Sequence, residues 1–270
     1  MEYIKALHTQ VPVIGFGTWK LQGKKCRDAV LSALDIGYRH LDTAQKYDNE
    51  ESVGEALHQS DISREEIFLT TKISPPNLRY NDFLDNFKTS LDKLKTDYVD
   101  LLLIHWPSLT VPIQETIKAM NKLQSDKSVK YIGVSNFSVT KTQKAMETSK
   151  TPLLTNQVHY DPFRTRSSMI EFCVQNHMML TAYSPLARGK VSKNSLLRKI
   201  GDRYNKTAAQ VTLRWLIQQR NVCVIPKAGS PEHQKENFDI FDFKLTKEEM
   251  EKIFQLQGGI KDKFRSILGI

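Results

Sequence analysis

The sequence predicts a single α/β domain of the (β/α)8, or TIM-barrel, class, and three observations support this. Short apolar runs alternate with longer amphipathic segments along the 270 residues. The apolar runs are continuous, as in parallel strands that are covered on both faces. The run VIGFGTW, residues 13–19, lacks the third glycine and the later acidic residue of a dinucleotide-binding fingerprint, which favours a closed barrel over an open doubly wound sheet.

We expect eight strands, each a short apolar run that ends on a polar or aromatic residue. They are residues 13–19, 39–44, 67–73, 98–106, 130–137, 153–160, 178–184 and 221–227. The segment before them, EYIKALHTQVPV, is expected to form a short β-hairpin at the bottom of the barrel.

Eight helices are expected between and after these strands, in strict alternation with them. Each has apolar residues at helical spacing, and Gly37 stands where a helix C-cap belongs. The helices are residues 26–37, 49–60, 81–95, 112–124, 140–149, 166–177, 207–219 and 246–257. No linker-like segment interrupts them, so residues 1–270 are expected to form one domain.

Composition excludes several classes of function. The net charge is +9, but basic and acidic residues are interleaved, which indicates solvated helix faces rather than a nucleic-acid interface. A positive balance favours small anionic ligands. Cys26, Cys173 and Cys223 are too widely spaced for a disulfide framework or a metal motif. With no signal peptide and no long apolar run, we expect a cytoplasmic protein without membrane partners.

Polar and aromatic residues gather where the expected strands end. In barrels of this class the active site lies at the C-terminal ends of the strands. Any one of these residues alone could be structural, but together they predict a site. They are Thr18, Trp19, Asp42, Lys72, His105, Trp106, Ser135, Asn136, Gln157, His159, Tyr183, Ser184 and Lys227.

The residue types at these ends narrow the chemistry. His105 and His159 lie on different strands without carboxylate or cysteine neighbours, so no metal site is expected. No serine-hydrolase elbow is present. An acid, an ammonium, an imidazole and a phenol remain. A lysine beside a tyrosine lowers the tyrosine pKa and suits it to act as a general acid, while His105 can orient a carbonyl oxygen.

A second set of residues matches the two ends of a nicotinamide dinucleotide. Ser135, Asn136 and Gln157 offer the hydrogen bonds that a carboxamide needs, and Tyr183 offers a ring face for stacking. In IPKAGSPEH, residues 225–233, a lysine precedes a Ser-Pro helix start, which is a typical anion site.

Over nearly its whole length the chain resembles the aldo-keto reductases, and among them the short bacterial-type members. The resemblance implies that Asp42, Tyr47, Lys72 and His105 form the catalytic tetrad, with Tyr47 as the proton donor. The motifs that carry it are GFGTWK, GYRHLDTAQKYDNEESVGEAL, FLTTK, DLLLIHWP, YIGVSNF, NQVHY, AYSPLARG and VIPKAGSPEHQKENFDIFDF.

The resemblance further implies an NADPH-dependent reduction of aldehydes and ketones by hydride transfer, without metal. The substrate would contact Trp19, Tyr47, His105 and Trp106. Ser184 to Gly189 would form part of the loop over the pyrophosphate. The cofactor contacts are expected at Thr18, Asp42, Ser135, Asn136, Gln157, Tyr183, Ser184, Leu186, Arg188, Lys227, Ser230, His233, Glu236 and Asn237.

Several residues depart from the family pattern. Ala228 and His233 replace a hydroxyl residue and an arginine, so NADPH preference over NADH should be narrow. His159 replaces a glutamate and Asp48 a glycine, and ISPPN follows TTK where a tryptophan is common. The loop SLTVPIQ and the tail GGIKDKFRSILGI are short, which indicates an open site for varied small carbonyls.

Two other readings stay open at this stage. A cofactor-sensing module could share the fold and bind the dinucleotide without turnover. An isomerase or aldolase would use Lys72 as a Schiff-base nucleophile, which requires a lowered lysine pKa. The sequence does not choose among 2-oxoaldehydes, sugar-derived ketones and aromatic aldehydes as substrates. A monomer is expected, because monomers are usual among the short relatives.

Overall fold

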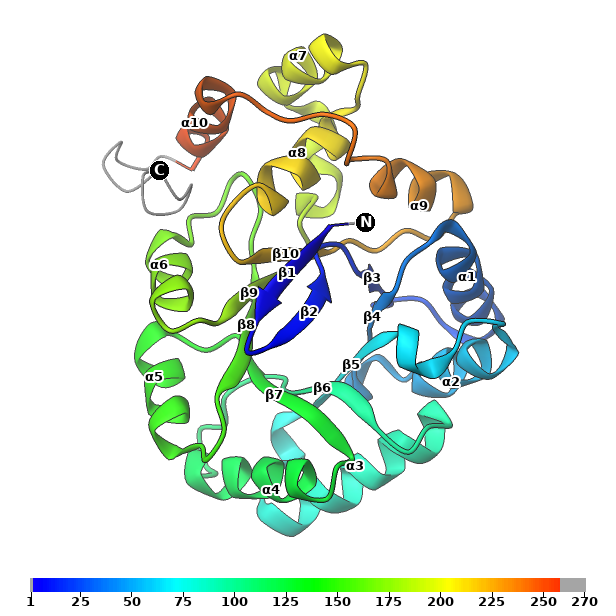
Figure 1. Cartoon of the computed structure of the whole chain (residues 1–270), viewed down its shortest axis with the longest axis vertical. Helices are drawn as coiled ribbons and strands as arrows, with labels where there is room; N and C mark the ends of the chain where they lie inside the picture. The colour runs from blue at the N-terminus through cyan, green and yellow to red at the C-terminus, as the bar shows by residue number, and fades with distance from the viewer. Residues whose placement is uncertain (1, 258–270) are drawn as a thin grey trace.

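The computed structural model describes residues 2–257, and its eight parallel strands form one barrel with the helices outside it (Figure 1). The sheet order is β10-β9-β8-β7-β6-β5-β4-β3. The strands are β3 Phe16–Gly17, β4 His40–Asp42, β5 Phe68–Ile73, β6 Val99–Ile104, β7 Val129–Ser135, β8 Leu153–His159, β9 Met179–Tyr183 and β10 Val222–Ile225. All eight expected strands are present, although the first is shorter than residues 13–19.

Hydrogen bonds between the first and last strands close the barrel. The N–H groups of Gly15 and Gly17 donate to the carbonyl oxygens of Val224 and Pro226, at 2.8 and 3.0 Å. A Cβ at Gly17 would lie 2.7 Å from the Ile225 carbonyl oxygen, so this close approach needs glycine. The predicted barrel class is confirmed.

The predicted N-terminal hairpin is also confirmed. β1 Tyr3–Ala6 and β2 Thr9–Pro12 pair antiparallel, and in Figure 1 they lie across one end of the barrel. Hairpin residues Gln10 and Pro12 share a small cavity with Phe68 at the start of β5. The hairpin therefore covers the N-terminal ends of the strands and leaves the opposite end free.

Ten helices and four short 3-10 turns connect the strands of residues 2–257. The helices are α1 Gly23–Ile36, α2 Glu50–Gln59, α3 Tyr80–Leu94, α4 Ile113–Ser125, α5 Val139–Thr148, α6 Ser167–Gln175, α7 Ser195–Tyr204, α8 Ala208–Ile217, α9 Pro231–Phe238 and α10 Lys247–Gln255. The turns are η1 Gln45–Tyr47, η2 Arg64–Glu66, η3 Pro75–Asn77 and η4 Ala187–Lys193. Gly37, with φ 117°, ends α1 as expected.

The expected strict alternation is wrong in the last third of the chain. Helix α7 was not predicted; Asn194 caps it, and only Leu197, Ile200 and Gly201 are buried from its ten residues. Helix α9 follows β10 directly, so the helix expected at residues 246–257 is the second one after that strand. Helix α7 is amphipathic, with Leu197 and Ile200 on its buried face, but it is an extra helix between β9 and α8. The start of α9 at Ser230 and Pro231 was expected, although α9 was not counted among the eight helices.

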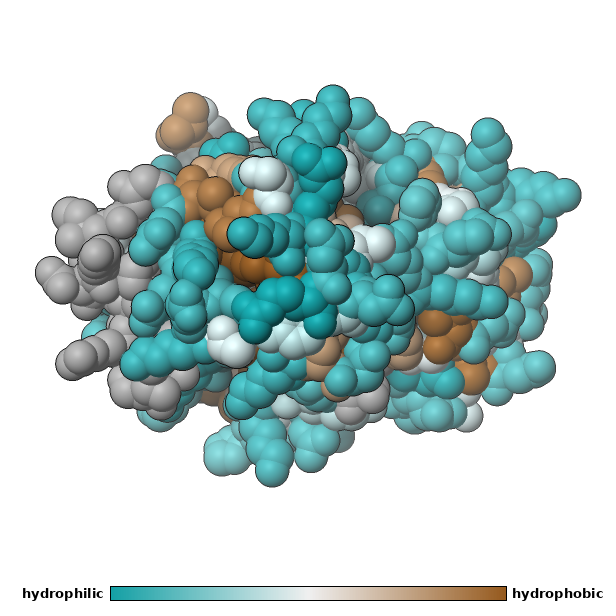
Figure 2. All heavy atoms as spheres, turned by 90° about the horizontal axis from the view of Figure 1, so that it is seen from above, coloured by the Kyte–Doolittle hydropathy of each residue, from teal (hydrophilic) through white to brown (hydrophobic). Residues whose placement is uncertain are grey.

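The face of the molecule drawn in Figure 2 is covered mainly by hydrophilic side chains. Figure 2 shows the edge that carries α7, where apolar side chains form small separate groups among charged ones. This agrees with the interleaving of acidic and basic residues in the sequence. Within residues 2–257, no helix is both long enough and apolar enough to cross a membrane.

Candidate active site

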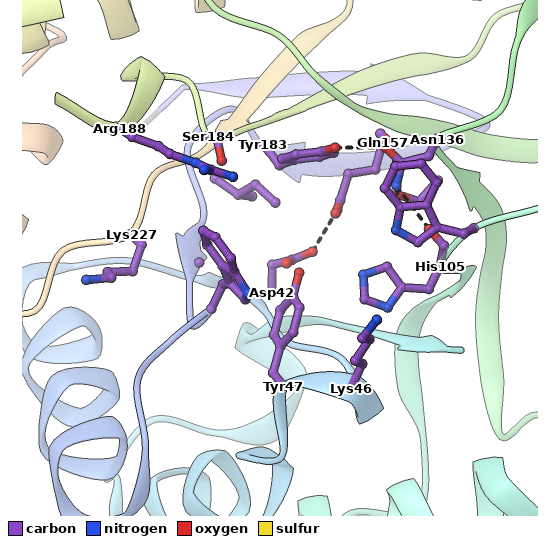
Figure 3. A pocket seen from close by; sticks show the side chains of 15 residues that line it. Asp42, Lys46, Tyr47, His105, Asn136, Gln157, Tyr183, Ser184, Arg188 and Lys227 are labelled. Atoms are coloured by element: carbon purple, nitrogen blue, oxygen red, sulfur yellow. Dashed lines mark hydrogen bonds between the residues drawn. The ribbon is translucent and has the colours of Figure 1, made fainter. Parts of the chain in front are cut away.

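A cavity of about 410 Å³ opens at the C-terminal ends of the strands, opposite the hairpin (Figure 3). Most of the residues expected at the strand ends line it. The lining residues are Gly17, Trp19, Asp42, Lys46, Tyr47, His105, Trp106, Ser135, Asn136, Gln157, Tyr183, Ser184, Arg188, Ile225 and Lys227.

A buried ion pair lies at the floor of this cavity. The Lys72 ammonium donates to Asp42 Oδ1 at 2.6 Å, to the Thr43 carbonyl oxygen at 2.7 Å and to the Tyr47 hydroxyl at 3.4 Å. Lys72 comes from β5 and Asp42 from the end of β4, while Tyr47 ends the 3-10 turn that follows. Three neighbouring segments thus bring a carboxylate, an ammonium and a phenol together.

The protonation of this group follows from burial and charge. Burial lowers the pKa of Lys72, but Asp42 and Tyr47 outweigh it and leave the pKa above its ordinary value. Burial raises the pKa of Tyr47, and the Lys72 charge only partly opposes this. The net lowering of the tyrosine pKa expected from the sequence is therefore wrong for the protein alone. Tyr47 stays protonated at neutral pH and keeps a proton to donate.

His105 lies beside Tyr47, with their ring centroids 5.6 Å apart. Burial, followed by the charges of Lys72 and Lys46, lowers the pKa of His105 to about 3. The imidazole is therefore neutral at physiological pH and carries one N–H. Its Nδ1 is buried and has no hydrogen-bond partner within residues 2–257, whereas the ring also lines the cavity, so Nε2 is the nitrogen available to a ligand oxygen.

The residues expected to hold a carboxamide already form one network. Gln157 donates to Asp42 Oδ2 at 2.7 Å, and the Ser135 hydroxyl donates to the Gln157 carbonyl oxygen at 2.9 Å. The Tyr183 hydroxyl donates to Asn136 Oδ1 at 2.8 Å. Asn136 holds a left-handed backbone with φ 62°, a conformation that is common at functional sites.

The residues expected at the dinucleotide's other end are more dispersed. Figure 3 shows Arg188 and Lys227 on the side of the cavity away from His105. The Ser230 hydroxyl accepts from the His233 N–H at the start of α9, as expected of a cap. His233 Nδ1 lies 3.1 Å from Glu236 Oε2. Seven residues expected in catalysis or in cofactor contacts do not line the cavity: Thr18, Lys72, Leu186, Ser230, His233, Glu236 and Asn237. His159, expected at a strand end, does not line it either.

Three lining residues, Gly17, Lys46 and Ile225, were missed by the sequence reasoning. Lys46 precedes Tyr47 in the 3-10 turn and contributes to the low pKa of His105. Its position beside the tyrosine was the available signal. Gly17 and Ile225 line the cavity through the barrel closure itself, which sequence spacing does not reveal.

Two departures from the family pattern have a structural explanation. Asp48 has φ 53°, so the glycine common at this position suits a left-handed backbone that aspartate also tolerates. His159 stacks on the Tyr183 ring, with centroids 5.3 Å apart, and its Nε2 lies 2.9 Å from Asp161 Oδ2. One face of Tyr183 is therefore covered by protein. Among residues 2–257 no group of three potential metal ligands lies together.

Comparisons with known proteins agree with this geometry. The model of the Aldo/keto reductase family matches residues 13–257. The chain is 38% identical to glyoxal reductase of Bacillus subtilis, covering 90% of this chain and 88% of the relative. It is 39% identical to 9,11-endoperoxide prostaglandin H2 reductase of Trypanosoma cruzi, covering 96% and 94%. A solved structure of a putative 2,5-diketo-D-gluconic acid reductase B superposes with a TM-score of 0.94 at 43% identity, covering 97% and 94%.

Proposed function

The chain belongs to the aldo/keto reductase family of oxidoreductases, which reduce carbonyl groups, and on this premise we propose that it reduces small aldehydes and ketones with NADPH, using Tyr47 as the proton donor. The observation that carries the proposal is the contact of Lys72 with both Asp42 and Tyr47 at the floor of an open cavity. We also propose that residues 1–270 act as one monomeric cytoplasmic domain.

The protein groups would divide the reaction between them. When bound, the reduced nicotinamide supplies a hydride to the carbonyl carbon. The Tyr47 hydroxyl gives its proton to the carbonyl oxygen, which completes the alcohol. The charge left on the Tyr47 oxygen lies 3.4 Å from the Lys72 ammonium, and the neutral His105 donates a hydrogen bond to the same substrate oxygen.

The cavity offers suitable groups for each end of the cofactor. Ser135, Asn136 and Gln157 would exchange their mutual hydrogen bonds for those of the carboxamide, beside the open face of Tyr183. Arg188 and Lys227 would meet the phosphates.

We propose NADPH over NADH, with a narrow margin. Lys227 can reach a 2′-phosphate, but His233 replaces an arginine and already lies beside the Glu236 carboxylate. The Michaelis constants of the two cofactors measure this margin. An equal or lower constant for NADH would overturn the preference.

A broad range of small carbonyl substrates is proposed from the shape of the site. Trp19 and Trp106 stand at the cavity with 38% and 47% of their surfaces exposed, so little covers the mouth. The short tail from residue 258 onwards lies outside the described residues. The relatives include glyoxal and methylglyoxal reductases, and small 2-oxoaldehydes are therefore the first substrates to test.

The protonation of Lys72 disfavours the isomerase and aldolase alternative. A Schiff-base lysine needs a lowered pKa, whereas Asp42 and Tyr47 leave the pKa of Lys72 raised against the effect of burial. Borohydride trapping of a substrate on Lys72 would revive this alternative. The cofactor-sensing alternative also predicts binding of the dinucleotide, but it predicts no turnover of a carbonyl substrate.

The deciding experiment compares wild type with Tyr47→Phe, using methylglyoxal and NADPH. Removing the hydroxyl should lower kcat by about 10²- to 10⁴-fold while NADPH binding, followed by its fluorescence, is retained. Tyr98→Phe is the matched control, because Tyr98 lies at the N-terminal end of β6. If wild type binds NADPH but reduces no aldehyde, the sensor alternative replaces the proposal.

A further inference from the structure

A second cavity, of about 590 Å³, adjoins the active site on the far side of Tyr183. It shares the lining residues Trp106, Asn136 and Tyr183 with the catalytic cavity, so the two cavities are adjacent. Its remaining wall comes from the loops after β7 and β8 and from the start of α6. The lining includes His159, Arg164, Arg166 and Ser167, and it contains no acidic residue. We name this space the arginine pocket.

Arg166 is half-buried and only partly engaged. Its Nε donates to the His159 carbonyl oxygen at 3.0 Å, and this side chain forms no ion pair within residues 2–257. Arg164 and Arg166 both line this cavity, and burial, followed by the charge of Arg164, lowers the pKa of Arg166. Two cations that line one cavity with no acidic residue in its lining create a site for an anion.

The nearest carboxylate, Asp161, is already occupied. Its Oδ1 accepts from the Phe163 N–H at 2.8 Å, and its Oδ2 lies 2.9 Å from His159 Nε2. Arg164 Nε is 3.9 Å from the same Oδ2, and half of the Arg164 side chain is exposed. One carboxylate therefore faces two guanidinium groups, and the local charge stays positive.

This positive charge extends to the wall of the catalytic cavity. Burial raises the pKa of Tyr183, and the charges of Arg166, Arg164 and Arg188 oppose it in that order. The affected hydroxyl is the one that donates to Asn136 in the active site. Because Tyr183 lines both cavities, an anion in the arginine pocket and a substrate in the catalytic cavity would lie beside the same side chain.

We propose that the arginine pocket binds the anionic group, a carboxylate or a phosphate, of a carbonyl substrate whose reactive end lies between Tyr47 and His105. The inference rests on the proposed function and narrows it to a substrate class. Arg164 and Arg166 are specificity residues in this scheme, since they contact the distal anion and not the reacting carbonyl.

Matched substrate pairs test the pocket through the ratio of their kcat/KM values. Succinic semialdehyde is compared with butanal, and para-carboxybenzaldehyde with benzaldehyde. Glyceraldehyde and its phosphate monoester distinguish a phosphate from a carboxylate preference. Wild type should favour the anionic partner of at least one pair, and Arg166→Gln or Arg164→Gln should reduce that ratio about tenfold or more, mainly through KM.

Control variants separate charge recognition from structural damage. Arg166→Lys keeps the charge and should retain most of the kcat/KM ratio between the anionic and the neutral substrate. If a variant instead loses activity because the hydrogen bond to the His159 carbonyl oxygen is missing, it should slow both substrates of a pair equally. Arg220→Gln removes the same charge from an exposed site before β10 and should leave the ratio unchanged. Equal ratios in wild type and both glutamine variants would overturn the arginine pocket while leaving the proposed function intact.

A binding measurement keeps the test independent of turnover. Titration calorimetry with terephthalate, which cannot be reduced, should show binding to wild type and weakened binding to the Arg164→Gln, Arg166→Gln double variant. Binding without aldehyde reduction would refute the proposed function but support the pocket. Equal binding to wild type and double variant, or none to either, would refute the pocket.

Discussion

Thr71 and Lys72 are consecutive residues of β5, yet they meet two different buried carboxylates. Thr71 points outward to the helix layer, where its hydroxyl donates to Glu50 of α2. Lys72 points inward, where its ammonium pairs with Asp42 at 2.6 Å. The two-residue period of a strand therefore places a structural carboxylate and a candidate catalytic one on opposite faces of the same segment.

The partners of the two carboxylates decide what each can do. Glu50 accepts from the hydroxyls of Thr71 and Ser90, and burial raises its pKa because no cation of the described residues, 2–257, forms an ion pair with it. Asp42 is held by an ammonium that also touches a phenol facing a cavity. Hydroxyl donors can satisfy a neutral acid, whereas only the charged pair can stabilise charge that develops during a reaction.

The largest effect is predicted for a substitution that breaks the buried ion pair of Lys72 and Asp42. Lys72→Met leaves the Asp42 carboxylate buried without its cation, which should cost about 3–5 kcal/mol of unfolding free energy and abolish aldehyde reduction. Urea unfolding and NADPH consumption measure the two effects.

The neighbouring Thr71→Val is the control for this change. It removes one hydroxyl from Glu50 and should cost about 1–3 kcal/mol with turnover retained. Similar stability losses in both variants, with activity kept in Lys72→Met, would show that the inner pair is structural too.

The inner face of β5 also shows why much of the site was predictable. An apolar run that ends on a polar residue places that residue at the rim of a parallel barrel, so Asp42, His105, Gln157 and Tyr183 could be assigned from the strand ends alone. The hairpin and the order of the strands followed from the same periodicity. These features depend on local pattern, which the sequence carries directly.

Features that depend on distant packing could not be predicted in this way. Helix α7 has apolar residues at helical spacing, but it packs against α8 and η4 as an addition to the eightfold alternation of strands and helices, so that alternation does not predict it. The raised pKa of Tyr47 depends on desolvation by the surrounding strands, which outweighs the adjacent Lys72. The arginine pocket needs loops after two strands to meet beside Tyr183. The sequence shows which residues are neighbours along the chain, but the burial of a residue depends on how the whole chain folds.

A second prediction asks whether the inner face alone makes a residue catalytic. His40 shares the inward face of β4 with Asp42 but is sealed, and burial lowers its pKa to about 4 against the opposing effect of Asp42. The neutral His40 should contribute fully to the free energy of unfolding above pH 6.5. As the pH falls toward 4, the free energy of unfolding should decrease by roughly 3 kcal/mol.

Urea unfolding of wild type and His40→Asn across this pH range isolates the contribution, and an NMR titration of His40 checks the pKa directly. His40→Asn should still reduce aldehydes at neutral pH. A pH dependence of stability identical to that of wild type would contradict the assignment.

The smallest effect is predicted for a substitution of Glu50, the carboxylate on the outer face of the barrel. Glu50→Gln keeps one carbonyl oxygen as an acceptor and should change stability at pH 7 by less than about 1 kcal/mol, with turnover unchanged. Because burial raises the folded-state pKa of Glu50 above 4.5, wild type gains most from this residue below that pH and loses the gain as pH rises through the folded-state pKa. The stability difference between wild type and Glu50→Gln should therefore shift in favour of the variant as pH increases, as followed by thermal unfolding. A difference that does not vary with pH, or a loss of activity as large as that of Lys72→Met, would mean that the two faces of β5 are not separated in function.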